Sequence, residues 1–519
     1  MHPARYTKRD FLLAAITALM VLVLSAGVLS ADLSRWGDDF AGYLNQAFAI
    51  ADHRQDEQYR LNAVMHPTTL PEEVQDGKLV YSWGFPLLEA GVYRLVGFDR
   101  TEYSSVIWYK LILLFSVAAC AAVLVLFLRR RFSLRLSVFL SVIFCINSML
   151  LNEINTLYGD IVFLLFTMLT FLLAECFVFA EKPSCRAGIG LLYALSMGFT
   201  YELRLNGFTV ILIALFGHGV CLVRKQVPVS GKRLVADALP YAGCAALVLL
   251  TERFLLPAAT SNMSDLRQMG LDSLFYNAWV MIERLYTFFD LTTGFRTYIL
   301  GALILMAAVT GLIRNGLRDN LYLSMLWFGT IIILLILPYD QGLRYMLNVL
   351  PVILMFSVYG FRWIWNTLKQ KWSLPGWMHQ KKTGMAVMGL ILCICAIPGA
   401  GKGVHLFSGL STEGSVGVYS EGAREMYRFI RTHVGEEETV GFGKPRALYL
   451  NTGRVSFRPD KNGHSMDELD YFLVSKRYDF IVEHTEEAIQ QPCIFENDEF
   501  ALYDLRHRIT SDPEVIPSY

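Results

Sequence analysis

The strongest constraint on this chain is a succession of apolar segments that match the thickness of a lipid bilayer. The first, residues 11–31, carries no charged side chain and follows a basic stretch that contains Arg5, Lys8 and Arg9. A run of about 20 apolar residues crosses the hydrocarbon core as a helix. Over 519 residues the chain is 54% hydrophobic and 18% charged, which excludes an ordinary soluble protein.

Ten further apolar segments predict about eleven transmembrane helices in all. These segments are residues 106–128, 134–151, 161–180, 187–201, 207–223, 235–256, 298–313, 321–337, 345–361 and 383–397. Lys and Arg fall in every loop predicted to lie inside, whereas the second outside loop, residues 152–160, is acidic. We therefore expect a cytosolic N-terminus. The first segment is longer than the core of a cleaved signal peptide, so a retained anchor is favoured.

Two regions are predicted to lie outside the membrane. A large first outside loop covers residues 32–103, and the composition changes again near residue 399. We expect residues 1–399 to form the transmembrane domain and residues 400–519 a small α/β domain on the outer side. Within the latter, the patterns predict helices at 421–434 and 466–476, strands at 439–443, 478–482 and 500–505, and extended segments at 448–450 and 454–457.

Two adjacent carboxylates, Asp38 and Asp39, follow the first apolar segment directly. They open a stretch with one apolar helical stripe, which predicts a helix lying flat on the membrane. The stripe consists of Phe40, Tyr43, Leu44, Ala47, Phe48 and Ala51. One interpretation is that an acid caps this helix, because carboxylates accept hydrogen bonds from free N–H groups there. The other is that an acid takes part in chemistry.

A third acid and two arginines lie at other predicted membrane boundaries. Asp160 ends the second outside loop, where it either caps the next helix or shares a pocket with Asp39. Arg204 and Arg344 lie at predicted outer ends of helices, against the charge trend of the loops. Each arginine either reaches lipid phosphate or pairs with Glu202 or Asp340, or else it binds the phosphate of a specific ligand.

Several classes of function are excluded or disfavoured. The chain has 46 basic and 46 acidic residues, so no overall charge favours nucleic acid. It contains no P-loop, no nucleophile elbow and no dinucleotide-binding glycine pattern. Its nine cysteines do not form a disulfide framework, and neither His53 nor His66 has the spacing of a metal site.

The motifs resemble those of the GT-C superfamily of integral-membrane glycosyltransferases, and most closely the bacterial branch related to protein O-mannosyltransferases and lipid A aminoarabinose transferases. The matching elements are residues 38–43 (DDFAGY) with Ala47, residues 81–88 (YSWGFPLL), Gly159-Asp160, and Arg344-Tyr345 with Pro351. This resemblance implies a multi-pass protein of the bacterial cytoplasmic membrane. It also implies an inverting transfer from a polyprenyl-phosphate sugar to a hydroxyl or amine of an envelope glycan, lipid or protein.

The same resemblance implies roles for individual residues. The family's general base usually lies four residues before a tyrosine, which selects Asp39 over Asp38. Arg344, Tyr345 and Arg204 would then bind the donor phosphate, while Asp160 orients the acceptor or Asp39, or joins Asp39 in holding Mg²⁺ or Mn²⁺. A secondary transporter or lipid flippase is the alternative, although such proteins tend to carry internal repeats and this sequence shows none.

Overall fold

The computed structural model describes residues 6–29, 36–65, 81–101, 105–204, 206–255, 274–281, 295–336, 343–371, 389, 417–459, 465–480, 482 and 484–507. Contacts between residues divide the chain into two compact units. The membrane unit contains residues 1–29, 82–85 and 110–411, and the α/β unit contains residues 30–81, 86–109 and 412–519. Most of the predicted first outside loop is thus grouped with the C-terminal residues. The boundary predicted between residues 399 and 400 lies outside the described residues.

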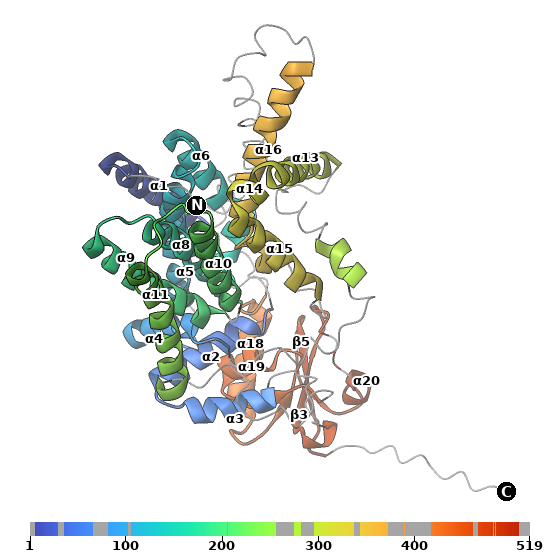
Figure 1. Cartoon of the computed structure of the whole chain (residues 1–519). Coiled ribbons are helices and arrows are strands. Elements are labelled where there is room, and N and C mark those ends of the chain that lie inside the picture. Colours follow the sequence, from blue (N-terminus) through green and yellow to red (C-terminus); the bar gives the residue numbers. More distant parts are fainter. Residues whose placement is uncertain are drawn as a thin grey trace, which may run out of the picture. The chain divides into compact units, whose positions relative to one another are not determined.

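The described part of the membrane unit is helical (Figure 1). Its helices are α1 (Lys8–Ala26), α5 (Val106–Arg129), α6 (Leu134–Cys145), α7 (Ser148–Glu153), α8 (Asp160–Val178), α9 (Pro183–Leu203), α10 (Gly207–Val223), α11 (Gly231–Leu250), α13 (Phe295–Gly311), α14 (Leu317–Asp319), α15 (Leu321–Ile336) and α16 (Leu350–Lys371). Two π-helical turns, η2 (Thr251–Leu255) and η4 (Leu312–Gly316), and one 3₁₀ turn, η5 (Leu343–Met346), join them.

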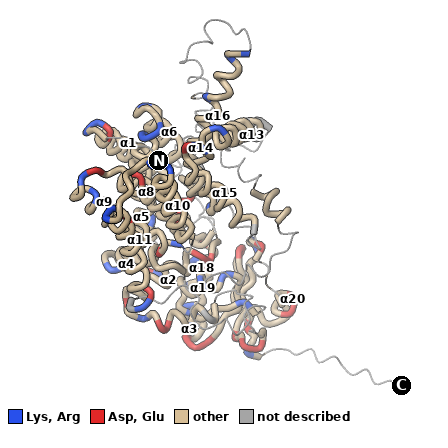
Figure 2. The backbone as a smooth tube through the Cα atoms, in the orientation of Figure 1, with Lys and Arg blue, Asp and Glu red and all other residues tan. Residues whose placement is uncertain are grey.

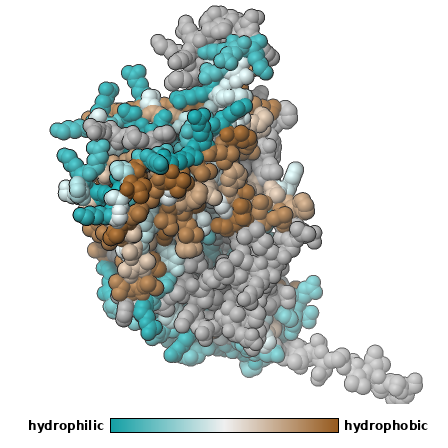
Figure 3. Space-filling model, viewed as in Figure 1, coloured by the Kyte–Doolittle hydropathy of each residue, from teal (hydrophilic) through white to brown (hydrophobic). Residues whose placement is uncertain are grey.

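Four of the described helices are long and apolar enough to cross a membrane: α1, α5, α8 and the segment Gly231–Arg253. Shorter apolar helices cover Leu134–Cys145, Gly207–Val223 and Leu321–Leu335. The backbone tube of Figure 2 carries few charged residues along these helices, and Figure 3 shows hydrophobic side chains exposed over them. Such apolar surface is stable in lipid, so the chain is a multi-pass membrane protein. The count of eleven stays a prediction, and the last predicted span, 383–397, lies almost wholly outside the described residues.

Two predicted spans differ from the structure. The segment 134–151 is not one helix, because α6 ends at Cys145 and the Asn147 side chain accepts a hydrogen bond from the N–H of Met149 to begin α7. The 12 residues of α6 extend about 18 Å, which is less than the roughly 30 Å of a hydrocarbon core. The helix predicted from residue 345 begins only at Leu350, and this leaves Arg344 and Tyr345 in the turn η5.

The α/β unit contains one five-stranded sheet with the strand order β2-β1-β3-β5-β4 (Figure 1). The strands are β1 (Val440–Gly441), β2 (Ser456–Phe457), β3 (Tyr471–Ser475), β4 (Cys493–Glu496) and β5 (Phe500–Asp504). Strand β1 pairs in parallel with β2 and β3, with Val440 opposite Ser456 and Tyr471, while β5 runs antiparallel to β3 and β4.

Helices complete this unit. They are α2 (Asp39–Ala51), α3 (Gln55–Met65), most of α4 (Gly84–Val96), α18 (Glu421–His433), α19 (Pro445–Thr452), α20 (Thr485–Ala488) and the 3₁₀ turn η7 (Met466–Glu468). Helix α3 contacts β2, α18 contacts β5, and α19 contacts both β2 and α2. Because α2 comes from the first loop and α19 from the C-terminal region, the unit joins segments about 400 residues apart.

The predictions for the C-terminal elements are confirmed for the helix at 421–434, and for the strand at 500–505, which is β5. The extended segment predicted at 448–450 is wrong, because Pro445 begins helix α19, which ends at Gly453 in the left-handed conformation (φ 74°). The helix predicted at 466–476 is also wrong. Residues 471–475 form β3, since pairing with β1 and β5 outweighs a local helical pattern. Residues 478–480 are not a strand.

Candidate functional site

Asp38 lies just before α2, but its side chain makes no capping hydrogen bond to that helix. Its Oδ2 instead accepts a hydrogen bond from Arg446 Nε at 2.6 Å, and its Oδ1 accepts one from the backbone N–H of Ala447 at 3.1 Å. Ala447 lies in the first turn of α19, where backbone N–H groups lack partners within the helix. The interpretation that Asp38 caps its own helix is therefore wrong, and its carboxylate instead accepts hydrogen bonds from the first turn of α19.

Asp39 has a different environment. Its Oδ1 accepts a hydrogen bond from the Tyr81 hydroxyl at 2.8 Å and lies 3.5 Å from Arg446 Nη2. Its side chain is 32% exposed, compared with 9% for Asp38. An incoming hydroxyl group can therefore approach Asp39, whereas Asp38 is enclosed by its two partners.

Burial and charge control the protonation of the two groups beside Asp39. Burial raises the pKa of the Tyr81 hydroxyl well above its usual value, so Tyr81 stays protonated and donates to the carboxylate. Burial alone would lower the pKa of Arg446, but Tyr81, Asp38 and Asp39 outweigh that effect and raise it. The cluster thus contains a permanent cation beside two acids.

One face of α2 holds Tyr81 in place. The side-chain amide of Gln46 donates to the Tyr81 carbonyl at 2.8 Å and its oxygen accepts from the Tyr81 N–H at 3.0 Å. The rings of Tyr43 and Tyr81 are 4.3 Å apart. Gly42 completes the contact, because a Cβ there would lie 2.5 Å from the Tyr81 ring and 3.1 Å from Arg446. Asp39, Gly42, Tyr43 and Gln46 share this face through helical spacing.

No local signal in the sequence marks Arg446 as part of this cluster. It lies 407 residues beyond Asp39, within a segment whose helical character is itself missed by the local pattern. A search for cations that would neutralise the acid pair could have suggested an arginine, but not which one.

Four other residues singled out in the sequence come together in the membrane unit. Asp160 is the first residue of α8, and its Oδ1 pairs with Arg204 Nη2 at 2.5 Å. Arg204 also lies over the Tyr345 ring at 4.6 Å. Arg344 lies over the rings of Tyr158 and Tyr345 at 4.6 and 5.1 Å. The Asp160 and Arg204 side chains are 3% and 12% exposed, so this is a buried ion pair.

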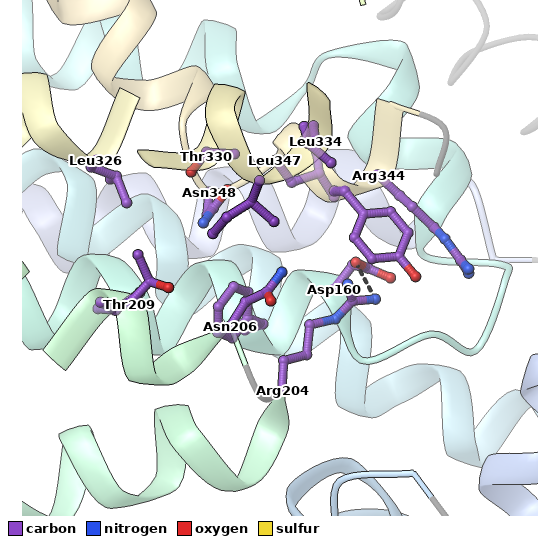
Figure 4. Close-up of a pocket in the computed structure, with 14 residues that line it drawn as sticks. Asp160, Arg204, Asn206, Thr209, Leu326, Thr330, Leu334, Arg344, Leu347 and Asn348 are labelled. Atoms are coloured by element: carbon purple, nitrogen blue, oxygen red, sulfur yellow. Dashed lines mark ion pairs between the residues drawn. The ribbon is translucent and has the colours of Figure 1, made fainter. Parts of the chain in front are cut away.

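These residues line one pocket. Its lining consists of Asp160, Phe163, Arg204, Asn206, Thr209, Val210, Leu326, Thr330, Ile333, Leu334, Arg344, Tyr345, Leu347 and Asn348. Figure 4 shows Asp160, Arg204 and Arg344 at one end, and Leu326 and Thr209 at the other. Among the described residues, Asp160 Oδ2 and Asn348 Oδ1 are buried without a hydrogen-bond partner. The pocket therefore has a charged end, several apolar side chains in its lining and two acceptors that a ligand can satisfy.

The residues around the acids fit a metal ion poorly. Within the part of the chain that the structure describes, no three His, Cys, Asp or Glu side chains gather closely enough to hold one. An arginine already lies beside Asp39 and beside Asp160 and supplies the positive charge. His53 lies beside Arg94, and His66 is outside the described residues.

Comparison with known proteins relates the fold to solved membrane enzymes. No protein-family model and no curated protein matches the sequence. The structure is similar to ArnT from Cupriavidus metallidurans bound to undecaprenyl phosphate, with a TM-score of 0.54, 12% identity, and 95% of this chain and 97% of that chain covered.

It is also similar to the Archaeoglobus fulgidus oligosaccharyltransferase in complex with Zn and sulfate, with a TM-score of 0.58, 12% identity, and 90% of this chain and 68% of that chain covered. The same enzyme, AglB, with an inhibitory peptide and a dolichol-phosphate gives a TM-score of 0.52 at 10% identity, over 89% of this chain and 69% of that chain. ArnT and AglB are GT-C proteins, so the predicted resemblance to this superfamily is confirmed at the level of the fold.

Proposed function

We propose that this chain is a glycosyltransferase that moves a sugar from a polyprenyl-phosphate donor to a hydroxyl or amine of an envelope glycan, lipid or protein. The observation that carries the proposal is the pocket with Arg204 and Arg344 at one end, Leu326 at the other, and further apolar side chains in its lining. A phosphate joined to a polyprenyl chain has the same two-part chemistry. Two of the similar structures were solved with undecaprenyl phosphate and with a dolichol-phosphate, which supports this ligand class.

The phosphate binds at the charged end of the pocket in this proposal. The planar guanidinium groups of Arg204 and Arg344 suit phosphate oxygens, and the negative charge on the leaving lipid phosphate grows during transfer. Tyr345 lies under both arginines and holds them in place. Asp160 fixes the orientation of Arg204 through their buried ion pair.

Asp39 acts as the general base. The acceptor oxygen forms a bond to the anomeric carbon and gives its proton to the Asp39 carboxylate. The bond between that carbon and the phosphate oxygen breaks, and the lipid phosphate leaves with the electron pair. A single displacement inverts the configuration. Asp38 does not take this role, because its oxygens are engaged by Arg446 and Ala447.

The reaction takes place at the outer face of a bacterial cytoplasmic membrane in this proposal, with the N-terminus in the cytosol. The acceptor group comes from an envelope glycan, lipid or protein, and no nucleic acid takes part. The arginines supply the positive charge near both acids, so the proposal requires no divalent cation.

The test is transfer from synthetic polyprenyl-phosphate sugars by the purified full chain in lipid nanodiscs. We expect Asp39→Asn to lower kcat by about 10²–10⁴-fold, since a general base contributes that much. Asp52→Asn is the matched control, because Asp52 lies at the other end of α2 and pairs with Arg54 on the surface. Near-normal turnover by Asp39→Asn, or no transfer by the unaltered chain from any such donor, contradicts the proposal.

A further inference from the structure

We infer that Arg446, contributed by the C-terminal region, is a positioning residue for Asp39. This inference rests on the proposed function, because it concerns the residue that acts there as the base. Arg446 reaches three groups at once: Nε donates to Asp38, Nη1 donates to the Tyr81 hydroxyl, and Nη2 lies 3.5 Å from Asp39 Oδ1. A planar guanidinium with fixed donor directions can orient several acceptors together, which an ammonium group cannot do.

Asp38 and Asp39 have different contacts, and these indicate different roles for the two carboxylates. Asp38 takes the short ion pair at 2.6 Å and the N–H of Ala447, and so anchors Arg446 and α19. Asp39 accepts the hydrogen bond from Tyr81, and its contact with Arg446 is the longer one. Asp39 is thus oriented while its side chain stays partly exposed. A base that remains reachable and yet keeps one orientation is what proton transfer to an incoming hydroxyl requires.

The packing fixes Arg446 itself. Its side chain is only 5% exposed, and its backbone carbonyl accepts a hydrogen bond from the Asn45 amide at 3.3 Å, so α2 and α19 are tied together on both sides of the guanidinium. Gly42 leaves just enough room for Arg446 and Tyr81 to meet above α2. Because Arg446 is held firmly, the position of α19 determines where its guanidinium lies and thereby how Asp38 and Asp39 are oriented.

A second anchor connects the start of the acid segment to the C-terminal region. Trp36 lies two residues before Asp38, and its ring is 5.5–6.4 Å from five aromatic rings of the α/β unit. These rings belong to Tyr427, Phe442, Tyr478, Phe480 and Phe500. The C-terminal region therefore holds the acid segment at two points and forms part of the catalytic apparatus.

The test compares Arg446→Met and Arg446→Lys in the full chain, with Arg428→Met as the control because Arg428 is exposed on α18. We expect Arg446→Met to lower kcat by about 100-fold while the KM for the donor changes by less than about threefold. Because a cation beside a carboxylate favours its charged form, removing it should move the acid limb of the kcat profile to higher pH. Arg446→Lys keeps the charge and should leave that limb in place.

Chemical rescue separates positioning from folding. In Arg446→Ala, added methylguanidinium should restore part of kcat and return the acid limb toward its original pH. If Arg446 only stabilises the fold, the thermal midpoint falls but the pH profile stays the same and methylguanidinium has no effect, which overturns the inference. The proposed function is tested separately from this inference, and it is contradicted if Asp39→Asn stays active. An inactive Asp39→Asn together with a fully active Arg446→Met overturns the positioning role alone.

Discussion

Two acid and arginine pairs in this molecule begin from the same local arrangement and differ in exposure. Asp39 and Asp160 are each the first residue of a helix, and each has an arginine beside it. The pair of Asp160 and Arg204 is short and buried, whereas Asp39 is partly exposed and lies farther from Arg446. The ion pair of Asp160 orients Arg204 inside the protein, whereas Asp39 is oriented by its neighbours and remains partly exposed, as proton transfer from an incoming hydroxyl requires.

The largest expected difference is in stability, when Asp160 and Asp39 are each replaced by alanine. Asp160→Ala leaves the Arg204 charge buried without its partner, which costs about 3–5 kcal/mol of unfolding free energy. Asp39→Ala should cost less than about 1 kcal/mol, because that pair is longer and more exposed. Thermal midpoints in detergent and the yield of monodisperse protein measure the difference.

Equal stability losses in the two variants would contradict the assignment of a structural role to Asp160 and an open position to Asp39. The double variant Asp160→Ala, Arg204→Leu is the control. It removes both charges and should recover much of the lost stability, since an apolar replacement of a buried pair is often tolerated.

The two pairs also show what can be predicted from the sequence. The membrane class and most helices follow from apolar run length, because a bilayer demands it whatever the tertiary contacts. Asp160, Arg204, Arg344 and Tyr345 were all predicted as site residues, and the structure brings them together at one pocket. Each lies at a helix end or in a turn. The three charged residues among them stand out in the sequence, because charges are rare beside apolar segments.

Arg446 was not predictable in the same way. Its contact with Asp38 joins residues 408 positions apart, and the local pattern around it favours an extended segment over the observed α19. The periodicity of apolar residues depends only on neighbours along the chain. It therefore cannot predict contacts between distant residues or the break between α6 and α7. The same limit explains β3, whose partners in the sheet decide its conformation.

Removal of an arginine from the pocket should affect donor binding and leave the chemistry of Asp39 unchanged. We expect Arg344→Gln to raise the KM for a polyprenyl-phosphate sugar by about tenfold, since a hydrogen bond to a charged group contributes about 1.5–3 kcal/mol. The kcat at saturating donor should also fall, because Arg344 stabilises the negative charge that grows on the leaving phosphate, but by less than in Asp39→Asn. Initial rates over a range of donor concentrations separate the two parameters.

Arg362→Gln is the matched control for that experiment. Arg362 also lies over an aromatic ring, Phe132 at 5.2 Å, and it belongs to the membrane unit but does not line the pocket. A tenfold rise in KM for Arg362→Gln as well, or no change in either KM or kcat for Arg344→Gln, would argue against the assignment of the pocket to the donor phosphate.

The tight packing around the acid cluster gives the smallest expected effect. Gly42→Ala places a methyl group 2.5 Å from the Tyr81 ring and 3.1 Å from Arg446. Glycine to alanine in a helix normally stabilises by about 0.5–1 kcal/mol, and the overpacking should reverse this to a loss of about 1–3 kcal/mol. Gly91→Ala on α4 meets no atom within 4 Å, so it should show the ordinary gain in thermal midpoint. If Gly42→Ala instead stabilises the chain with unchanged kcat, Tyr81 and Arg446 are free to move, and the oriented position of Asp39 loses its support.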